Sequence, residues 1–129
     1  MENTSQKPSV LLVDDEPDIL ELLQAELSEE NYQVFTANGG QSAFSAIQQN
    51  SIDFCVSDIH MPHGDGPELL GLIQKNIKNP PIMIFMTAYR PDLEKDLLKL
   101  GAQGIIFKPF TCDKLIELLN SLDKTCHKN

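Results

Sequence analysis

The chain has no tryptophan, only three cysteines and no long apolar run. The cysteines are an odd number without a closely spaced pair, so they indicate neither a disulfide framework nor a zinc ribbon. They are Cys55, Cys112 and Cys126. The longest apolar stretch, at residues 82–86, is far shorter than the roughly 20 residues that cross a bilayer, and residues 1–9 do not resemble a signal peptide. We therefore expect a cytoplasmic protein with reduced thiols and no membrane partner.

Basic residues are also scarce. Ten Lys and Arg residues stand against 19 Asp and Glu residues, which gives a formal net charge of −9 at pH 7. Because direct binding to nucleic acid needs clustered Lys and Arg, this charge argues against a nucleic-acid partner. An acidic chain suits a metal ion or a basic protein surface instead. Its 129 residues have the composition of one globular domain.

Short β-rich runs alternate with helical patterns along the chain. The runs cover residues 9–13, 33–37, 53–57, 82–86 and 104–107. Between them Leu and Ile recur at helix spacing, and Pro17 and Pro91 fit first helical positions. The alternation predicts an α/β fold, a doubly wound five-stranded parallel sheet with helices on both faces. We expect one domain over residues 9–124, with flexible segments at 1–8 and 125–129.

Polar side chains follow four of these runs at their carboxyl ends. They are Asp14, Asp15, Asp58, Thr87 and Lys108. Taken singly, such an acid more often caps the next helix, and such a threonine simply ends a strand. Ligands of open α/β sheets, however, bind beyond the carboxyl ends of the strands. The joint placement of all five residues therefore predicts one site at this edge of the sheet.

The residue types at this edge suit a cation and a phosphoryl group. Three neighbouring carboxylates repel one another unless a cation offsets their charge, and Mg²⁺ prefers such oxygen ligands. Lys108 adds a compact positive charge, and Thr87 adds a hydroxyl donor. These groups can balance the charge that spreads over a phosphoryl group during transfer. Asp58 is then the candidate nucleophile, forming an aspartyl phosphate.

Four motifs in this order resemble the receiver domains of bacterial two-component response regulators, the CheY-like domains. They are VLLVDDEP at residues 10–17, SDIHMP at 57–62, MTA at 86–88 and KPF at 108–110. The resemblance extends over nearly the whole chain. It implies the flavodoxin-like strand order 2-1-3-4-5, which is the order that this family is known for.

The resemblance also implies roles for the matching residues. Asp58 would accept a phosphoryl group from a phosphohistidine of a sensor histidine kinase or phosphotransfer protein. Asp15, Asp58 and the backbone carbonyl of His60 would hold Mg²⁺, or Mn²⁺ in its place, with Asp14 acting through water. Lys108 would pair with Asp58 and then with its phosphate. The domain would be a regulatory phosphoacceptor, with its own autophosphorylation and autodephosphorylation chemistry, rather than an enzyme.

Further roles follow from the same resemblance. Thr87 would move to hydrogen-bond a phosphoryl oxygen, assisted by the backbone N–H of Ala88. The peptide bond between Lys108 and Pro109 would be cis. A downstream protein or attached output domain would dock on the face made by the fourth helix, the fifth strand and the fifth helix.

One position departs from the family pattern. Ile105 stands three residues before Lys108, where an aromatic switch residue is usual. Coupling through a rotating ring at that position is therefore excluded. Phe107 is the nearest aromatic residue on the same strand, and we expect it to point to the opposite face.

Two other functions compete with the phosphoacceptor. A pseudo-receiver would bind partners without being phosphorylated, although all five strand-end groups are present here. An aspartyl-nucleophile phosphatase also uses a strand-end Asp with Mg²⁺, Thr and Lys. That class normally carries a second Asp two residues after the nucleophile, where this chain has His60.

The residues two positions after Asp58 and Thr87 generate a prediction about the lifetime of the phosphorylated form. They are His60 and Tyr89, which in the family border the path of the attacking water. Because both are bulky, we expect the double alanine variant to dephosphorylate at a changed rate, measured by the decay of the phosphorylated intact mass. An unchanged rate would show that neither side chain affects this step.

Overall fold

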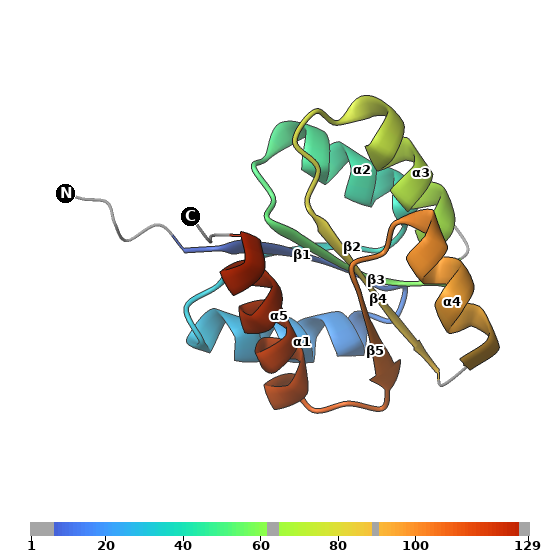
Figure 1. Ribbon diagram of the computed structural model, residues 1–129. Helices are drawn as coiled ribbons and strands as arrows, with labels where there is room; N and C mark the ends of the chain where they lie inside the picture. The colour runs from blue at the N-terminus through green and yellow to red at the C-terminus, as the bar shows by residue number, and fades with distance from the viewer. Residues whose placement is uncertain (1–6, 62–64, 89–90, 127–129) are drawn as a thin grey trace.

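Five parallel strands form one sheet in the order β2-β1-β3-β4-β5, as the sequence predicts. The computed structural model describes residues 7–61, 65–88 and 91–126 (Figure 1). The strands are β1 (Ser9–Val13), β2 (Gln33–Ala37), β3 (Phe54–Asp58), β4 (Ile82–Ala88) and β5 (Gly104–Lys108). The helices are α1 (Pro17–Glu29), α2 (Gly40–Gln49), α3 (Gly66–Asn76), α4 (Pro91–Leu100) and α5 (Cys112–Cys126). None of the helices in the described ranges is long and apolar enough to span a membrane.

Strand pairing extends further toward the carboxyl ends than the apolar runs do. Asp58 pairs with Met86 across β3 and β4, and Ala88 pairs with Lys108 across β4 and β5. The sequence-based ends of β3, β4 and β5 therefore fall one or two residues short, whereas those of β1 and β2 are confirmed. The polar residues at these strand ends belong to the strands because their backbone groups continue the hydrogen bonding between strands, while their side chains lie at the edge of the sheet.

Two apolar clusters cover the two faces of the sheet. Because successive side chains of a strand point to opposite faces, Leu11 and Phe85 belong to one cluster while Leu12 and Ile84 belong to the other. The first cluster contains residues of α2, α3 and α4, and the second contains residues of α1 and α5. Figure 1 shows α2 and α3 on one side of the sheet and α1 and α5 on the other. All five residues of β1 are buried, as expected for a strand covered on both faces.

The strand order places a topological switch point between β1 and β3. The helix after β1 lies on one face of the sheet, and the helix after β3 lies on the other. A crevice opens at the carboxyl ends of such strands because the two connections diverge. Asp14 follows β1 and Asp58 ends β3, so both acids stand at the switch point.

Close packing fixes the start of α3 against the end of β3. The Asp65 side chain caps α3 by accepting a hydrogen bond from the backbone N–H of Glu68 at 2.9 Å. The backbone N–H of Gly66 donates to the Ile59 carbonyl at 2.9 Å. A Cβ atom on Gly66 would lie 2.6 Å from Cε1 of Phe85 and 2.8 Å from the Asp58 carbonyl oxygen. A glycine is therefore required for this close approach.

This packing predicts that Gly66→Ala destabilises the protein. The added methyl must displace either a buried ring or the backbone beside Asp58, at a cost of about 1–3 kcal/mol in the free energy of unfolding. Gly71→Ala is the matched control, because a Cβ atom there meets nothing within 4 Å. That change should stabilise α3 by about 0.5–1 kcal/mol. Urea unfolding of both variants measures the difference, and equal stabilities would contradict the packing argument.

Candidate functional site

Three carboxylates converge where β1 and β3 end. One oxygen from each of Asp14, Asp15 and Asp58 lies within 4.8 Å of the other two. The convergence follows from the register, because Val13 pairs with Ser57 and the next residues are Asp14 and Asp58. Asp14 is fully buried, Asp58 is half-buried and Asp15 is exposed. The cluster is therefore anchored inside the protein and open to solvent on one side.

Lys108 brings an ammonium group into the same cluster from the end of β5. Its Nζ lies 3.1 Å from Oδ2 of Asp58 and 3.3 Å from Oδ2 of Asp14. Both contacts are hydrogen bonds as well as ion pairs. The peptide bond that follows, between Lys108 and Pro109, is cis, as the family resemblance implies.

Backbone N–H groups hold the other oxygen of Asp14 and of Asp58. The N–H of Ile59 donates to Oδ1 of Asp58 at 2.7 Å, and the N–H of Glu16 donates to Oδ1 of Asp14 at 3.0 Å. Both carboxylates are thus oriented with their second oxygen toward Lys108. Sequence patterns did not reveal these donors, because any residue except proline supplies a backbone N–H.

Burial and charge oppose each other at this site. Burial raises the pKa of Asp14, although the hydrogen bond from Glu16 and the charge of Lys108 partly offset the effect. For Lys108, burial lowers the pKa, but the hydrogen bond and charge of Asp58, together with Asp14, outweigh it and leave the pKa above its ordinary value. Lys108 is therefore protonated at neutral pH, while ionised Asp14 costs free energy.

The donor set fits a divalent cation. When ionised, the three carboxylates carry three negative charges against the one positive charge of Lys108, so within the described residues of the cluster two negative charges are left over. The ligand atoms are all oxygens, and the exposed position of Asp15 leaves room for bound water. Hard cations such as Mg²⁺ take carboxylate oxygens and retain several waters. The residues present match that preference in both charge and chemistry.

The remaining predicted residues lie around this cluster. Thr87 is buried near the end of β4, and Ala88 is the last residue of that strand. His60 is exposed in the segment after β3. Tyr89 lies outside the described residues. The structure therefore places Thr87, Ala88 and His60 at the sheet edge, and their roles stay predictions.

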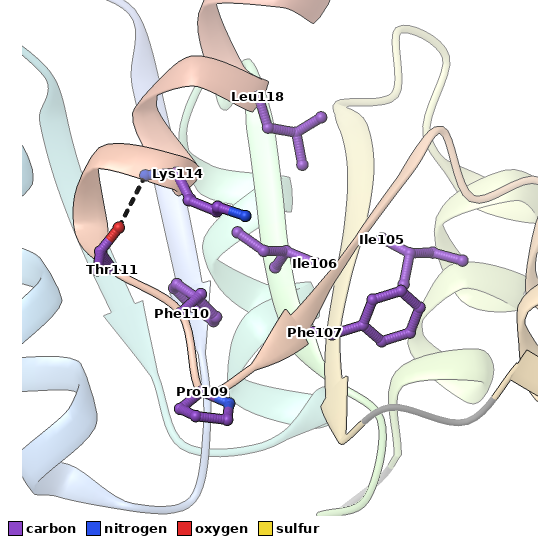
Figure 2. A pocket seen from close by; sticks show the side chains of 8 residues that line it. All are labelled: Ile105, Ile106, Phe107, Pro109, Phe110, Thr111, Lys114 and Leu118. Carbon is purple, nitrogen blue, oxygen red and sulfur yellow. Dashed lines mark hydrogen bonds between the residues drawn. The ribbon is translucent and has the colours of Figure 1, made fainter.

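The expectation for Phe107 is wrong. Residues two apart on a regular strand share a face, and β5 continues without interruption through Ile105, Phe107 and Lys108. Figure 2 shows Ile105 and Phe107 on the same side of β5, with Ile106 on the other. Ile105 packs against the cluster that α2, α3 and α4 cover. Phe107 therefore brings an aromatic ring to the face where Ile105 lacks one.

Comparisons with known proteins agree with this geometry. The family model described as the response regulator receiver domain matches residues 10–120. The chain is 31% identical to the receiver domain of Francisella response regulator 1452, with a TM-score of 0.85 over 93% of this chain and 99% of that one. It is 37% identical to response regulator protein TrrA of Thermotoga maritima, solved in complex with Mg²⁺ and BeF, with a TM-score of 0.78 over 89% and 98%.

A longer curated relative is similar over part of its length. Response regulator GtcR of Aneurinibacillus migulanus is 39% identical over 103 residues, which cover 79% of this chain and 42% of that protein. The chain thus spans less than half the length of this relative.

The raised pKa of Asp14 predicts how stability depends on pH. The pKa of Asp14 is higher in the folded protein than in the unfolded chain. The contribution of this carboxyl group to the free energy of unfolding is therefore fully present at low pH and is lost as the pH rises through the folded-state pKa. Asp14→Asn should therefore raise the free energy of unfolding at pH 7, by about 1 kcal/mol. The gain should shrink as the pH falls toward 3.8, the ordinary value for this carboxyl group.

Urea unfolding at several pH values measures this effect. Asp15→Asn is the control, because that side chain is exposed and its change should stay within about 0.5 kcal/mol. A loss of stability in Asp14→Asn at pH 7 would mean that the ion pair with Lys108 outweighs the cost of burial.

Proposed function

Because the chain belongs to the family of response regulator receiver domains, we propose that it is a phosphoacceptor whose conformation depends on phosphorylation of Asp58. The observation that carries the proposal is the position of the Asp58 carboxylate. It stands at the switch point, 3.1 Å from the Lys108 ammonium and beside two further acids. This arrangement supplies a nucleophile, a counter-charge and a cation-binding set within one site.

In the proposed reaction, a carboxylate oxygen of Asp58 forms a bond to phosphorus. The bond between phosphorus and the imidazole nitrogen of a phosphohistidine breaks, and that nitrogen retains the bonding electron pair. Lys108, already within hydrogen-bond reach of Asp58, offsets the negative charge of the phosphoryl oxygens. Thr87 and the backbone N–H of Ala88 would donate hydrogen bonds to the same oxygens.

Asp15 and Asp58, with the carbonyl of His60 and with Asp14 through water, would hold Mg²⁺ or Mn²⁺. When bound, the divalent ion would supply positive charge that offsets the repulsion between the Asp58 carboxylate and the anionic phosphoryl group. The charge balance of the site supports this assignment, since the described part of the cluster has two more negative charges than Lys108 offsets. The relative TrrA of Thermotoga maritima, solved with Mg²⁺ and BeF, supports it as well.

Phosphorylation would then shift an existing equilibrium between two conformations. A sensor histidine kinase or phosphotransfer protein would supply the phosphoryl group in the cytoplasm. A downstream protein or attached output domain would read the result on the face of α4, β5 and α5. The family membership supports this division of roles.

Asp58→Asn tests the proposal. With Mg²⁺ and acetyl phosphate, the wild-type protein should gain the mass of one phosphoryl group, and the variant should gain none, because an amide is not a nucleophile of this kind. Intact-mass spectrometry gives the readout. Asp18→Asn is a matched control, since Asp18 is an exposed acid in the first turn of α1 and should leave the mass gain intact.

The same experiment separates the competing functions. Turnover of many phosphate esters without a stable adduct would favour a phosphatase. Mg²⁺ binding without a mass gain, either with acetyl phosphate or with a phosphorylated kinase, would favour a pseudo-receiver. A mass gain that persists in Asp58→Asn would place the phosphoryl group on another residue.

A further inference from the structure

A pocket of about 600 Å³ opens at the free edge of β5 (Figure 2). Its walls come from β5, from the segment after it and from the first turns of α5. They include Ile105, Phe107, Phe110 and Leu118 among apolar residues, with Lys114 as a basic residue. Within the described residues β5 is the last strand of the sheet, so one of its edges has no neighbouring strand there. The pocket therefore lies beside the strand that carries Lys108.

Phe107 connects this pocket to the candidate phosphoryl site. It pairs in register with Thr87 across β4 and β5. Directly paired residues of neighbouring parallel strands point to the same face, and such strands lie about 4.8 Å apart. The ring of Phe107 is thus the lateral neighbour of the Thr87 side chain on one side and a wall of the pocket on the other.

Phe85 and Phe107, which share the face of Thr87 on β4 and β5, differ in the space beside them. Thr87 is only 5% exposed, and protein interiors contain little spare volume, so its displacement must move a neighbour. Phe85, two residues earlier on the same face of β4, is fully buried. Its ring lies so close to Gly66 that there is no space between them for a methyl group. Phe107 is only half-buried and borders the open volume of the pocket.

We propose that Phe107 is a positioning residue that couples Thr87 to the pocket at the free edge of β5. When Thr87 moves toward a phosphoryl group on Asp58, the Phe107 side chain moves with it, and the shape of the pocket changes. The inference rests on the proposed function, because it takes the movement of Thr87 from it. It assigns the relay to the bulk of the Phe107 side chain, on the same face of β5 as Ile105.

Nuclear magnetic resonance with Mg²⁺ and beryllofluoride tests the coupling. The backbone amide of Ile59, which hydrogen-bonds Asp58, reports on the site, and the backbone amide of Leu118 reports on the far wall of the pocket. In the wild-type protein both amides should shift. In Phe107→Ala the Ile59 shift should remain, and the Leu118 shift should be lost.

Two further variants make the test specific. Phe107→Leu keeps most of the bulk of the side chain but has no ring current. It should restore the Leu118 shift, because packing rather than the ring current carries the signal. Ile106→Val is the control, because Ile106 lines the same pocket from the opposite face of β5 and should leave both shifts intact. Phe107→Leu also keeps the test usable if Phe107→Ala does not fold.

The outcomes distinguish this inference from the function on which it rests. No shift of Ile59 in the wild-type protein would count against the proposed phosphoryl site itself. A shift of Ile59 without one of Leu118 would refute the coupling while leaving the site in place. A Leu118 shift that survives in Phe107→Ala, or that Phe107→Leu fails to restore, would refute the role of Phe107.

Discussion

The ammonium of Lys108 between two buried or half-buried carboxylates is the interaction on which the site depends. Asp14 and Asp58 stand side by side because β1 and β3 are neighbours in register, and without a counter-charge their repulsion would oppose the fold. Lys108 offsets only part of that charge. The switch point therefore keeps an excess of negative charge that a divalent cation and a phosphoryl group together can balance. The same excess charge that costs folding free energy is the charge that would bind the cation.

Much of this arrangement could be predicted from the sequence. Continuous apolar runs and helix-spaced leucines are determined by local periodicity, so the α/β class and the five strands followed directly. The resemblance of the four motifs implies the strand order, and the rule that ligands bind at the carboxyl ends of parallel strands predicts that Asp14, Asp58 and Lys108 lie together. Such residues can be recognised in the sequence because a charged or polar side chain directly follows an apolar run.

Other features depend on three-dimensional packing and could not be predicted from the sequence. The backbone donors of Ile59 and Glu16 have no side-chain signature, and the need for glycine at position 66 arises from a helix approaching the Asp58 carbonyl. The alternation of side chains along a strand is enough to place Phe107 on the face of Ile105, so the expectation of the opposite face has no physical basis. Its register with Thr87 could not be obtained from the sequence, because it requires the pairing of β4 with β5.

The most direct test of the central claim is a crystal structure with Mg²⁺ and beryllofluoride. The charge-balanced site predicts beryllium bonded to a carboxylate oxygen of Asp58, a cation held by the acids of the cluster, and Lys108 turned from Asp14 toward a fluoride. Electron density for beryllofluoride elsewhere on the protein, with the contacts of Lys108 to both acids unchanged, would contradict it.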